Sequence, residues 1–209
     1  STPGGCELGP RPIDLHLDAL RKLGATVSID GGEILCRSGN MRGRDIVLSF
    51  PSVGATENIM LAATACTGTT RIINAAREPE IEDLQSFLLK IGAFVRGAGR
   101  SEICVQGGQT RQRAEHSVMP DRIEAATYLC AAAACRGHIE LRDIRPQHIA
   151  TVISILSDAG CDIKTDTNCA IIKSARRISA LPPVQTMPYP GFPTDAQSQL
   201  MAAACLAEG

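Results

Sequence analysis

Three proline-to-glycine segments recur in this chain at an almost constant interval. Successive prolines are 67 residues apart and successive glycines 68 apart: Pro12, Pro79 and Pro146, with Gly24, Gly92 and Gly160. A repeat of this length indicates a supersecondary unit that must pack against its neighbours to bury its apolar face. The fold is therefore limited to a tandem array of one recurring unit.

Each of these segments predicts an amphipathic helix. Proline is tolerated at the first helical position, and glycine just past the end adopts the left-handed cap. Apolar residues recur at helical spacing between them: Ile13, Leu17, Leu20; Ile81, Leu84, Leu88, Ile91; Ile149, Val152, Leu156. We expect three helices that each bury one face.

A second set of helices alternates with the first, at residues 54–68, 122–137 and 195–209. Their second halves are alanine-rich and apolar on nearly all sides, which is typical of buried helices. Strand-like runs lie between the helices, at 46–50, 70–74, 138–142 and 170–173. The sequence thus predicts an α/β unit of strand, buried helix, strand, amphipathic helix and strand pair. In this register the chain stops at Gly209, where earlier copies lead into a strand. We therefore expect a segment of a longer protein.

Composition excludes several classes of function. The 21 basic and 22 acidic residues give a net charge of −1, which argues against binding nucleic acid or a membrane surface through bulk charge. No signal peptide is recognisable and no apolar run approaches the roughly 20 residues that span a bilayer, so we expect a cytoplasmic protein.

The nine cysteines are odd in number and include no Cys-x-x-Cys pair. We expect them to be reduced, with Cys66, Cys130, Cys135 and Cys205 in the core. The four histidines are scattered without a second ligand at metal-binding spacing, so neither a metal nor another cofactor is predicted.

The first fifteen residues form a glycine-rich loop that carries Cys6 and runs into a predicted helix. A thiol beside Arg11 and a helix N-terminus is expected to have a lowered pKa, and such a loop suits a lid over an anion. A terminus without fixed structure and with an incidental cysteine is the alternative.

Proline-marked loops at 50–54, 119–122 and 192–195 precede the buried helices. Helix N-termini present unpaired amides, so several together would form an anion pocket. Taken singly, Ser52, Asp121, Thr194 and Asp195 are read first as N-caps. Arginines near these loops, Arg77, Arg122 and Arg145, either bind phosphate or carboxylate or form surface ion pairs. Glu78 and Glu124 favour the helix dipole in either case.

Five motifs together resemble the UDP-N-acetylglucosamine 1-carboxyvinyltransferase family: residues 3–16, 50–58, 74–81, 120–124 and 188–195. The resemblance runs through all 209 residues. It implies the inverse α/β barrel of enolpyruvyl transferases (EPT/RTPC-like), with two pseudo-symmetric domains and an active site between them. Residues 1–119 would be the later part of the first domain and 120–209 the earlier part of the second.

The implied reaction transfers the enolpyruvyl group of phosphoenolpyruvate to the 3′-hydroxyl of UDP-N-acetylglucosamine and releases phosphate. This is the first committed step of peptidoglycan synthesis, and so it bears on cell wall biogenesis, cell shape and cell division. Because the family is about twice as long, the segment alone is expected to be inactive.

The resemblance also implies roles for individual residues. Cys6 matches the cysteine that protonates phosphoenolpyruvate and is alkylated by fosfomycin, and Asp195 matches a general base beside the sugar hydroxyl. Arg11 faces the phosphate and, with Pro12, Ile13, Asp14 and Leu15, lines the UDP-sugar site. Ser52, Val53 and Gly54 match the diphosphate loop, and Glu78 and Arg122 lie near the reacting groups. Phe50 stands where some members have a lysine.

Two other functions fit the repeat. An EPSP synthase shares the enolpyruvyl transfer, but its site does not use a Gly-Gly-Cys loop acid. A non-catalytic repeat module leaves unexplained why Cys6, Arg11, Arg122 and Asp195 are all chemically competent.

Overall fold

The computed structural model of the chain describes residues 13–174 and 176–208. The chain divides into two compact units, one ending at Ser117 and the next beginning at Val118. This division lies two residues from the boundary expected after residue 119. The assignment of each unit to part of an enolpyruvyl transferase domain stays a prediction.

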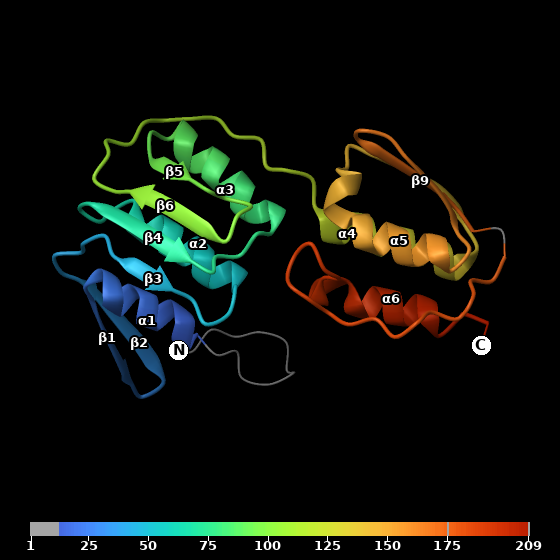
Figure 1. Cartoon of the computed structure of the whole chain (residues 1–209), viewed down its shortest axis with the longest axis horizontal. Coiled ribbons are helices and arrows are strands. Elements are labelled where there is room, and N and C mark those ends of the chain that lie inside the picture. The colour runs from blue at the N-terminus through green and yellow to red at the C-terminus, as the bar shows by residue number, and fades with distance from the viewer. Residues whose placement is uncertain (1–12, 175, 209) are drawn as a thin grey trace. The chain divides into compact units, whose positions relative to one another are not determined.

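The first unit contains three helices and six strands within the described residues: α1 (Asp14–Leu23), β1 (Ala25–Asp30), β2 (Glu33–Ser38), β3 (Asp45–Val47), α2 (Val53–Ala63), β4 (Thr69–Ile73), α3 (Pro79–Lys90), β5 (Phe94–Arg96) and β6 (Glu102–Gln106). Its four-stranded sheet has the order β3-β4-β6-β5, in which β3 and β4 are parallel and the other pairs antiparallel. The β1–β2 hairpin forms a separate two-stranded sheet that follows α1 (Figure 1).

The second unit contains α4 (Arg122–Cys135), β7 (His138–Arg142), the 3-10 helix η1 (Pro146–Ile149), α5 (Ala150–Asp158), β8 (Asp162–Thr165), β9 (Cys169–Lys173), the 3-10 helix η2 (Thr194–Ala196) and α6 (Gln197–Ala204). Its antiparallel sheet has the order β7-β9-β8. The order matches β4-β6-β5 of the first unit, strand for strand. The repeat predicted from proline and glycine spacing is therefore confirmed by the topology.

The helix boundaries confirm most of the predicted positions of proline at helix starts and of glycine after helix ends. Pro79 is the first residue of α3 and Pro146 the first of η1. Gly24, Gly92 and Gly160 all have left-handed backbones, with φ of 105°, 90° and 97°. Two boundaries differ. Helix α1 begins at Asp14, two residues after Pro12, and the third amphipathic helix begins with the 3-10 turn η1 before α5.

The buried helices end earlier than predicted. Helix α2 stops at Ala63, five residues before Gly68, and α6 stops at Ala204. Helix α4 ends in a left-handed Arg136, with φ of 54°, so Gly137 is not its cap. Terminal glycines therefore mark the region of these helix ends rather than the cap itself.

The first strand of the predicted unit is present only once in the described residues, as β3 before α2. Residues 107–121 form no strand. They run along α3 instead, where the Gln112 amide donates to Ile91 O at 2.9 Å and Lys90 Nζ donates to Glu115 O at 3.2 Å. His116 Nε2 lies 3.1 Å from an Asp83 carboxylate oxygen. These polar attachments replace the expected strand pairing.

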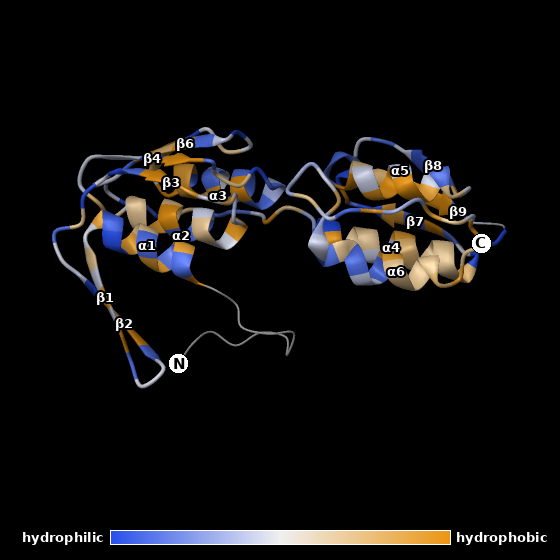
Figure 2. Ribbon diagram, turned by 60° about the horizontal axis from the view of Figure 1, so that its bottom comes forward, coloured by the Kyte–Doolittle hydropathy of each residue, from blue (hydrophilic) through white to orange (hydrophobic). Residues whose placement is uncertain are grey.

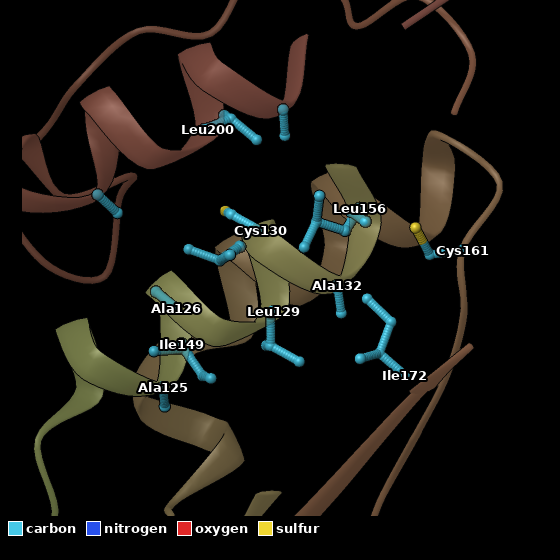
Figure 3. Packing of buried hydrophobic residues seen from close by; sticks show 14 of the residues in the cluster. Ala125, Ala126, Leu129, Cys130, Ala132, Ile149, Leu156, Cys161, Ile172 and Leu200 are labelled. Atoms are coloured by element: carbon cyan, nitrogen blue, oxygen red, sulfur yellow. The ribbon is translucent and has the colours of Figure 1, made fainter. Parts of the chain in front are cut away.

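Each unit has its own apolar core. Hydrophobic stretches, coloured orange, occur in both the helices and the strands of each unit (Figure 2). In the second unit the alanines of α4 let α6 and α5 approach it closely, so that Leu129 and Cys130 are fully covered (Figure 3). Burial, together with the neighbouring Cys161, raises the pKa of Cys130 to about 11. This thiol is therefore unreactive at neutral pH.

The eight cysteines within the described residues are all free, as expected. Cys66 and Cys130 are buried, but Cys135 and Cys205 are exposed, so their prediction as core residues is wrong. Both follow the last buried turn of their helices, where the apolar pattern no longer faces the core. No helix in the described part of the chain is long and apolar enough to cross a membrane.

Candidate functional site

The loop before α2 is a capped helix start. Ser52 has an extended backbone and its Oγ accepts a hydrogen bond from the Ala55 amide at 3.3 Å. The Ser52 amide donates to Phe50 O at 2.8 Å, which closes a tight turn ahead of the helix. Val53 and Gly54 form the first turn of α2. Their partly exposed amides supply the positive end of a helix dipole.

Helix α1 lies directly against this turn. A Cβ on Gly54 would approach His16 Cε1 to 3.2 Å, so the lack of a side chain at Gly54 admits the imidazole. The Asn58 amide donates to His16 Nδ1 at 2.6 Å and fixes the ring. Since His16 follows Asp14 and Leu15 on α1, two of the predicted binding segments, 13–15 and 52–54, lie beside each other.

A third segment joins them through Thr56, which is completely buried. Its hydroxyl donates to Ser52 O at 2.8 Å and accepts from the Ala76 amide at 3.1 Å. Asn74, with a left-handed φ of 59°, donates its side-chain amide to Leu48 O at 2.9 Å. The Ala76–Thr56 and Asn74–Leu48 bonds tie the segment that carries Glu78 to the start of α2 and to the residues just before the Ser52 loop.

Glu78 is 8% exposed and begins α3 without a side-chain capping bond. Its Oε2 accepts a hydrogen bond from the Arg77 amide at 2.9 Å, as expected for a buried polar group. Nearby, burial and then the charge of Glu80 raise the pKa of Glu57 on α2. The site in the first unit therefore combines two helix N-termini with carboxylates.

In the second unit, Asp121 caps α4. Its Oδ1 accepts from the amides of Ile123 at 2.7 Å and Glu124 at 3.1 Å. Arg122 is only 8% exposed, and its guanidinium carbon lies 5.9 Å from the centre of the Tyr189 ring. Arg122 is thus buried, whereas Arg77 and Arg145 are exposed.

Asp195 behaves differently from the other cap candidates. It lies in η2, and neither η2 nor α6 has a side-chain capping bond. Because Pro193 and Ala196 occupy the N-cap positions, Thr194 and Asp195 fall inside the turn, and their prediction as caps is wrong. Among the described residues none donates a hydrogen bond or a salt bridge to the exposed Asp195 carboxylate. This group is available to a ligand.

Cys6, Arg11 and Pro12 lie outside the described residues, so their predicted roles stay predictions. Sequence reasoning named Ile13, Asp14, Leu15, Ser52, Val53, Gly54 and Glu78, and the structure gathers them around the start of α2. It assigned no role to His16, Thr56 and Asn74, although all three lie in the matching motifs, because their contacts join segments remote in sequence. The described residues contain no group of three or more side chains placed to hold a metal ion.

A cavity of about 470 Å³ in the second unit contains none of these residues. It lies between α6 and the 181–192 segment and is lined mainly by apolar groups such as Leu181, Phe192 and Met201. Its lining offers no charge for an anionic ligand, so size alone does not mark it as the site.

Comparison with known proteins decides the family. The profile of EPSP synthase (3-phosphoshikimate 1-carboxyvinyltransferase) matches residues 1–209. The chain belongs to the EPSP synthase family. Within it, the chain is 48% identical over its whole length to UDP-N-acetylglucosamine 1-carboxyvinyltransferase 2 of Caldanaerobacter subterraneus, and covers 50% of that protein. It is 50% identical to UDP-N-acetylglucosamine 1-carboxyvinyltransferase 1 of Symbiobacterium thermophilum, covering 47%. The chain thus spans about half the length of these relatives.

Solved structures confirm that the fold is that of an EPSP synthase family member. The enolpyruvyl transferase NikO from Streptomyces tendae matches 95% of the chain with a TM-score of 0.80 at 20% identity, over 50% of its own chain. EPSP synthase from Acinetobacter baumannii matches 99% with a TM-score of 0.68 at 24% identity, over 49% of its chain. The expected α/β enolpyruvyl transferase fold is therefore correct.

Proposed function

We propose that this chain is about half of a UDP-N-acetylglucosamine 1-carboxyvinyltransferase. The whole enzyme would transfer the enolpyruvyl group of phosphoenolpyruvate to the sugar 3′-hydroxyl, release phosphate and so begin peptidoglycan synthesis. The main support for this proposal is the 48–50% identity, along the whole chain, to relatives that bear this name. The available Asp195 carboxylate and the buried Arg122 in the matching motifs support it.

In the proposed reaction, the 3′-hydroxyl oxygen bonds to C2 of phosphoenolpyruvate while the methylene carbon C3 gains a proton. Asp195 accepts the hydroxyl proton and Cys6 supplies the proton to C3. The resulting tetrahedral adduct then loses a proton from C3 as the C2–O bond to phosphate breaks. Atoms and charges balance, because the enol ether and inorganic phosphate are the only products.

Binding would use both described sites. Residues Ser52, Val53 and Gly54 would hold the diphosphate, chiefly through the amides of Val53 and Gly54, since a helix N-terminus favours anions. Segment 13–15, with Arg11 and Pro12, would line the UDP-sugar. Glu78 and Arg122 would lie near the reacting groups, where Arg122 offsets the negative charge of phosphoenolpyruvate. Loss of the enzyme would impair the cell wall and, through it, cell division and the cell cycle.

Fosfomycin supplies a covalent probe of the same proposal. An epoxide carbon would bond to the Cys6 sulfur while the C–O bond of the ring opens and the oxygen takes a proton. We propose a cytoplasmic enzyme without metal or cofactor, whose partners are its two small substrates rather than nucleic acid or membrane.

A chimera tests the proposed function. This chain replaces the matching half of the Caldanaerobacter relative, and phosphate release from phosphoenolpyruvate is measured with either UDP-N-acetylglucosamine or 3-phosphoshikimate as acceptor. We expect turnover with the nucleotide sugar alone. Turnover with 3-phosphoshikimate, or a folded chimera that is inactive with both acceptors, would contradict the proposal. The 209-residue chain alone should release no phosphate, because the remaining charged groups of the site are absent.

A further inference from the structure

The loop at residues 187–192 contacts Arg122 through Tyr189 and is followed in the chain by Asp195. Arg122 and Asp195 are the two candidate site residues of the second unit. The Met187 amide donates to Phe192 O and the Gly191 amide to Pro188 O, both at 2.9 Å, so the loop closes on itself. Phe192 is 3% exposed and anchors it in the core. A Cβ on Gly191 would lie 2.5 Å from Met187 Cβ, which only glycine avoids. The loop is therefore a fixed turn with Tyr189 near its tip.

Two neighbouring helices brace this turn. Thr151 on α5 donates its hydroxyl to Pro190 O at 2.7 Å. Arg122 on α4 presents its guanidinium to the Tyr189 ring, 5.9 Å from the centroid. The first brace contacts the backbone and the second contacts an aromatic face, so they can be removed separately.

The Tyr189 ring also contributes a favourable electrostatic interaction at the start of α4. Arg122 is the first residue of that helix and is 8% exposed, so a buried cation lies at the positive end of a helix dipole. An aromatic face carries a negative quadrupole that attracts guanidinium, and more strongly when water is excluded. The ring thus favours one position of the Arg122 side chain.

A second link joins α4 to the helix after Asp195. Gln199 on α6 donates to Thr127 Oγ1 at 3.1 Å, and the Thr127 hydroxyl donates to Ile123 O at 2.8 Å. Asp195 lies between Tyr189 and Gln199 in the chain, and both of these residues contact α4. Since its carboxylate has no partner of its own among the described residues, its position follows from the backbone that these two contacts hold.

We propose that Tyr189 is a positioning residue for the transfer reaction. Its ring fixes the Arg122 guanidinium and, through the 187–192 loop, sets the distance between Arg122 and the Asp195 carboxylate. This inference rests on the proposed function. It assigns Tyr189 no contact with substrate.

The test compares Tyr189→Leu, which removes the ring, with Tyr189→Phe, which keeps it. In the 209-residue chain, the Arg122 Nε–H resonance should be shifted upfield by the ring in the parent and in Tyr189→Phe, and should lose that shift in Tyr189→Leu. Thr151→Val removes the backbone brace and serves as the control for a purely structural effect. It should lower the urea midpoint while leaving the Arg122 resonance shifted.

In the chimera, Tyr189→Leu should lower kcat by about tenfold with a smaller change in KM, and Tyr189→Phe should recover most of that loss. An Arg122 resonance indifferent to Tyr189→Leu, or an active Tyr189→Leu chimera with parental kcat, would overturn the positioning role. An inactive parent chimera would instead refute the proposed function. The two failures are therefore distinguishable.

Discussion

The starts of α4 and α6 follow the same sequence pattern and have different structures. Each comes after a proline-marked loop and carries an aspartate, Asp121 or Asp195. Asp121 accepts two amide hydrogen bonds, at 2.7 and 3.1 Å, whereas Asp195 lies in a 3-10 turn that has no side-chain cap. One aspartate caps a helix, and the other makes no capping bond. The pattern alone does not distinguish the two roles, but the capping geometry does.

The largest expected effect concerns Asp195. Asp195→Ala in the chimera should lower kcat by about 10²- to 10⁴-fold, because the hydroxyl proton would lose its acceptor. The urea midpoint of the 209-residue chain should not change, since no capping bond is lost. Parental turnover in Asp195→Ala, or a clear loss of stability, would remove the contrast with Asp121.

Asp121 should show the opposite behaviour. Asp121→Ala is expected to lower the free energy of unfolding by about 1–2 kcal/mol, because two amides of α4 lose their acceptor. Hydrogen exchange in the first turn of α4, measured alongside urea unfolding, reports the change locally. Asp121→Asn retains an acceptor oxygen and should recover most of the stability. Equal stability of Asp121→Ala and the parent would show that the cap is dispensable.

The cap of α2 should contribute less than that of α4. Ser52 accepts a single amide bond, and that bond is 3.3 Å long. Ser52→Ala should therefore cost about 0.5–1 kcal/mol, and Ser52→Asp should restore the acceptor. Urea unfolding compares the series. If Ser52→Ala lost as much free energy of unfolding as Asp121→Ala, the length and number of the capping bonds would not predict how much each cap stabilises its helix.

The sequence was sufficient to predict the structural features that repeat along the chain. Proline and glycine punctuation, with helical apolar spacing, predicted the three amphipathic helices, and the strand pairs followed the same register. It also identified Ser52 and Asp121 as possible caps. These features depend on residues close together in the chain, where backbone restrictions and hydrogen bonding act locally.

What the sequence did not reveal depends on tertiary contacts. Thr56 joins the Ser52 and Ala76 segments from a position that resembles any helical threonine. Residues 107–121 follow α3 because polar side chains such as Gln112 find acceptors there, which no periodicity signals. Asp195 could not be separated from Asp121 by sequence, because both follow a proline-marked loop and only the structure places Asp195 in a 3-10 turn without a side-chain cap.

The smallest expected effect distinguishes a partly buried glutamate of α2 from an exposed glutamate of α4 by pH. Burial, followed by the charge of Glu80, raises the pKa of Glu57, so the folded state binds that proton more tightly than the unfolded state. Ionised Glu57 therefore destabilises the fold above its folded-state pKa, and this penalty shrinks as pH falls from that pKa and is gone below the unfolded-state pKa. Glu57→Gln should raise the urea midpoint at pH 7 and leave it unchanged at about pH 3, where the parent side chain is neutral in both states. Glu124, exposed in the first turn of α4, serves as the matched position, and Glu124→Gln should not raise the midpoint, because an acidic side chain there favours the helix dipole. Equal changes in the urea midpoint of Glu57→Gln and Glu124→Gln at pH 7 would mean that burial and the charge of Glu80 do not raise the pKa of Glu57.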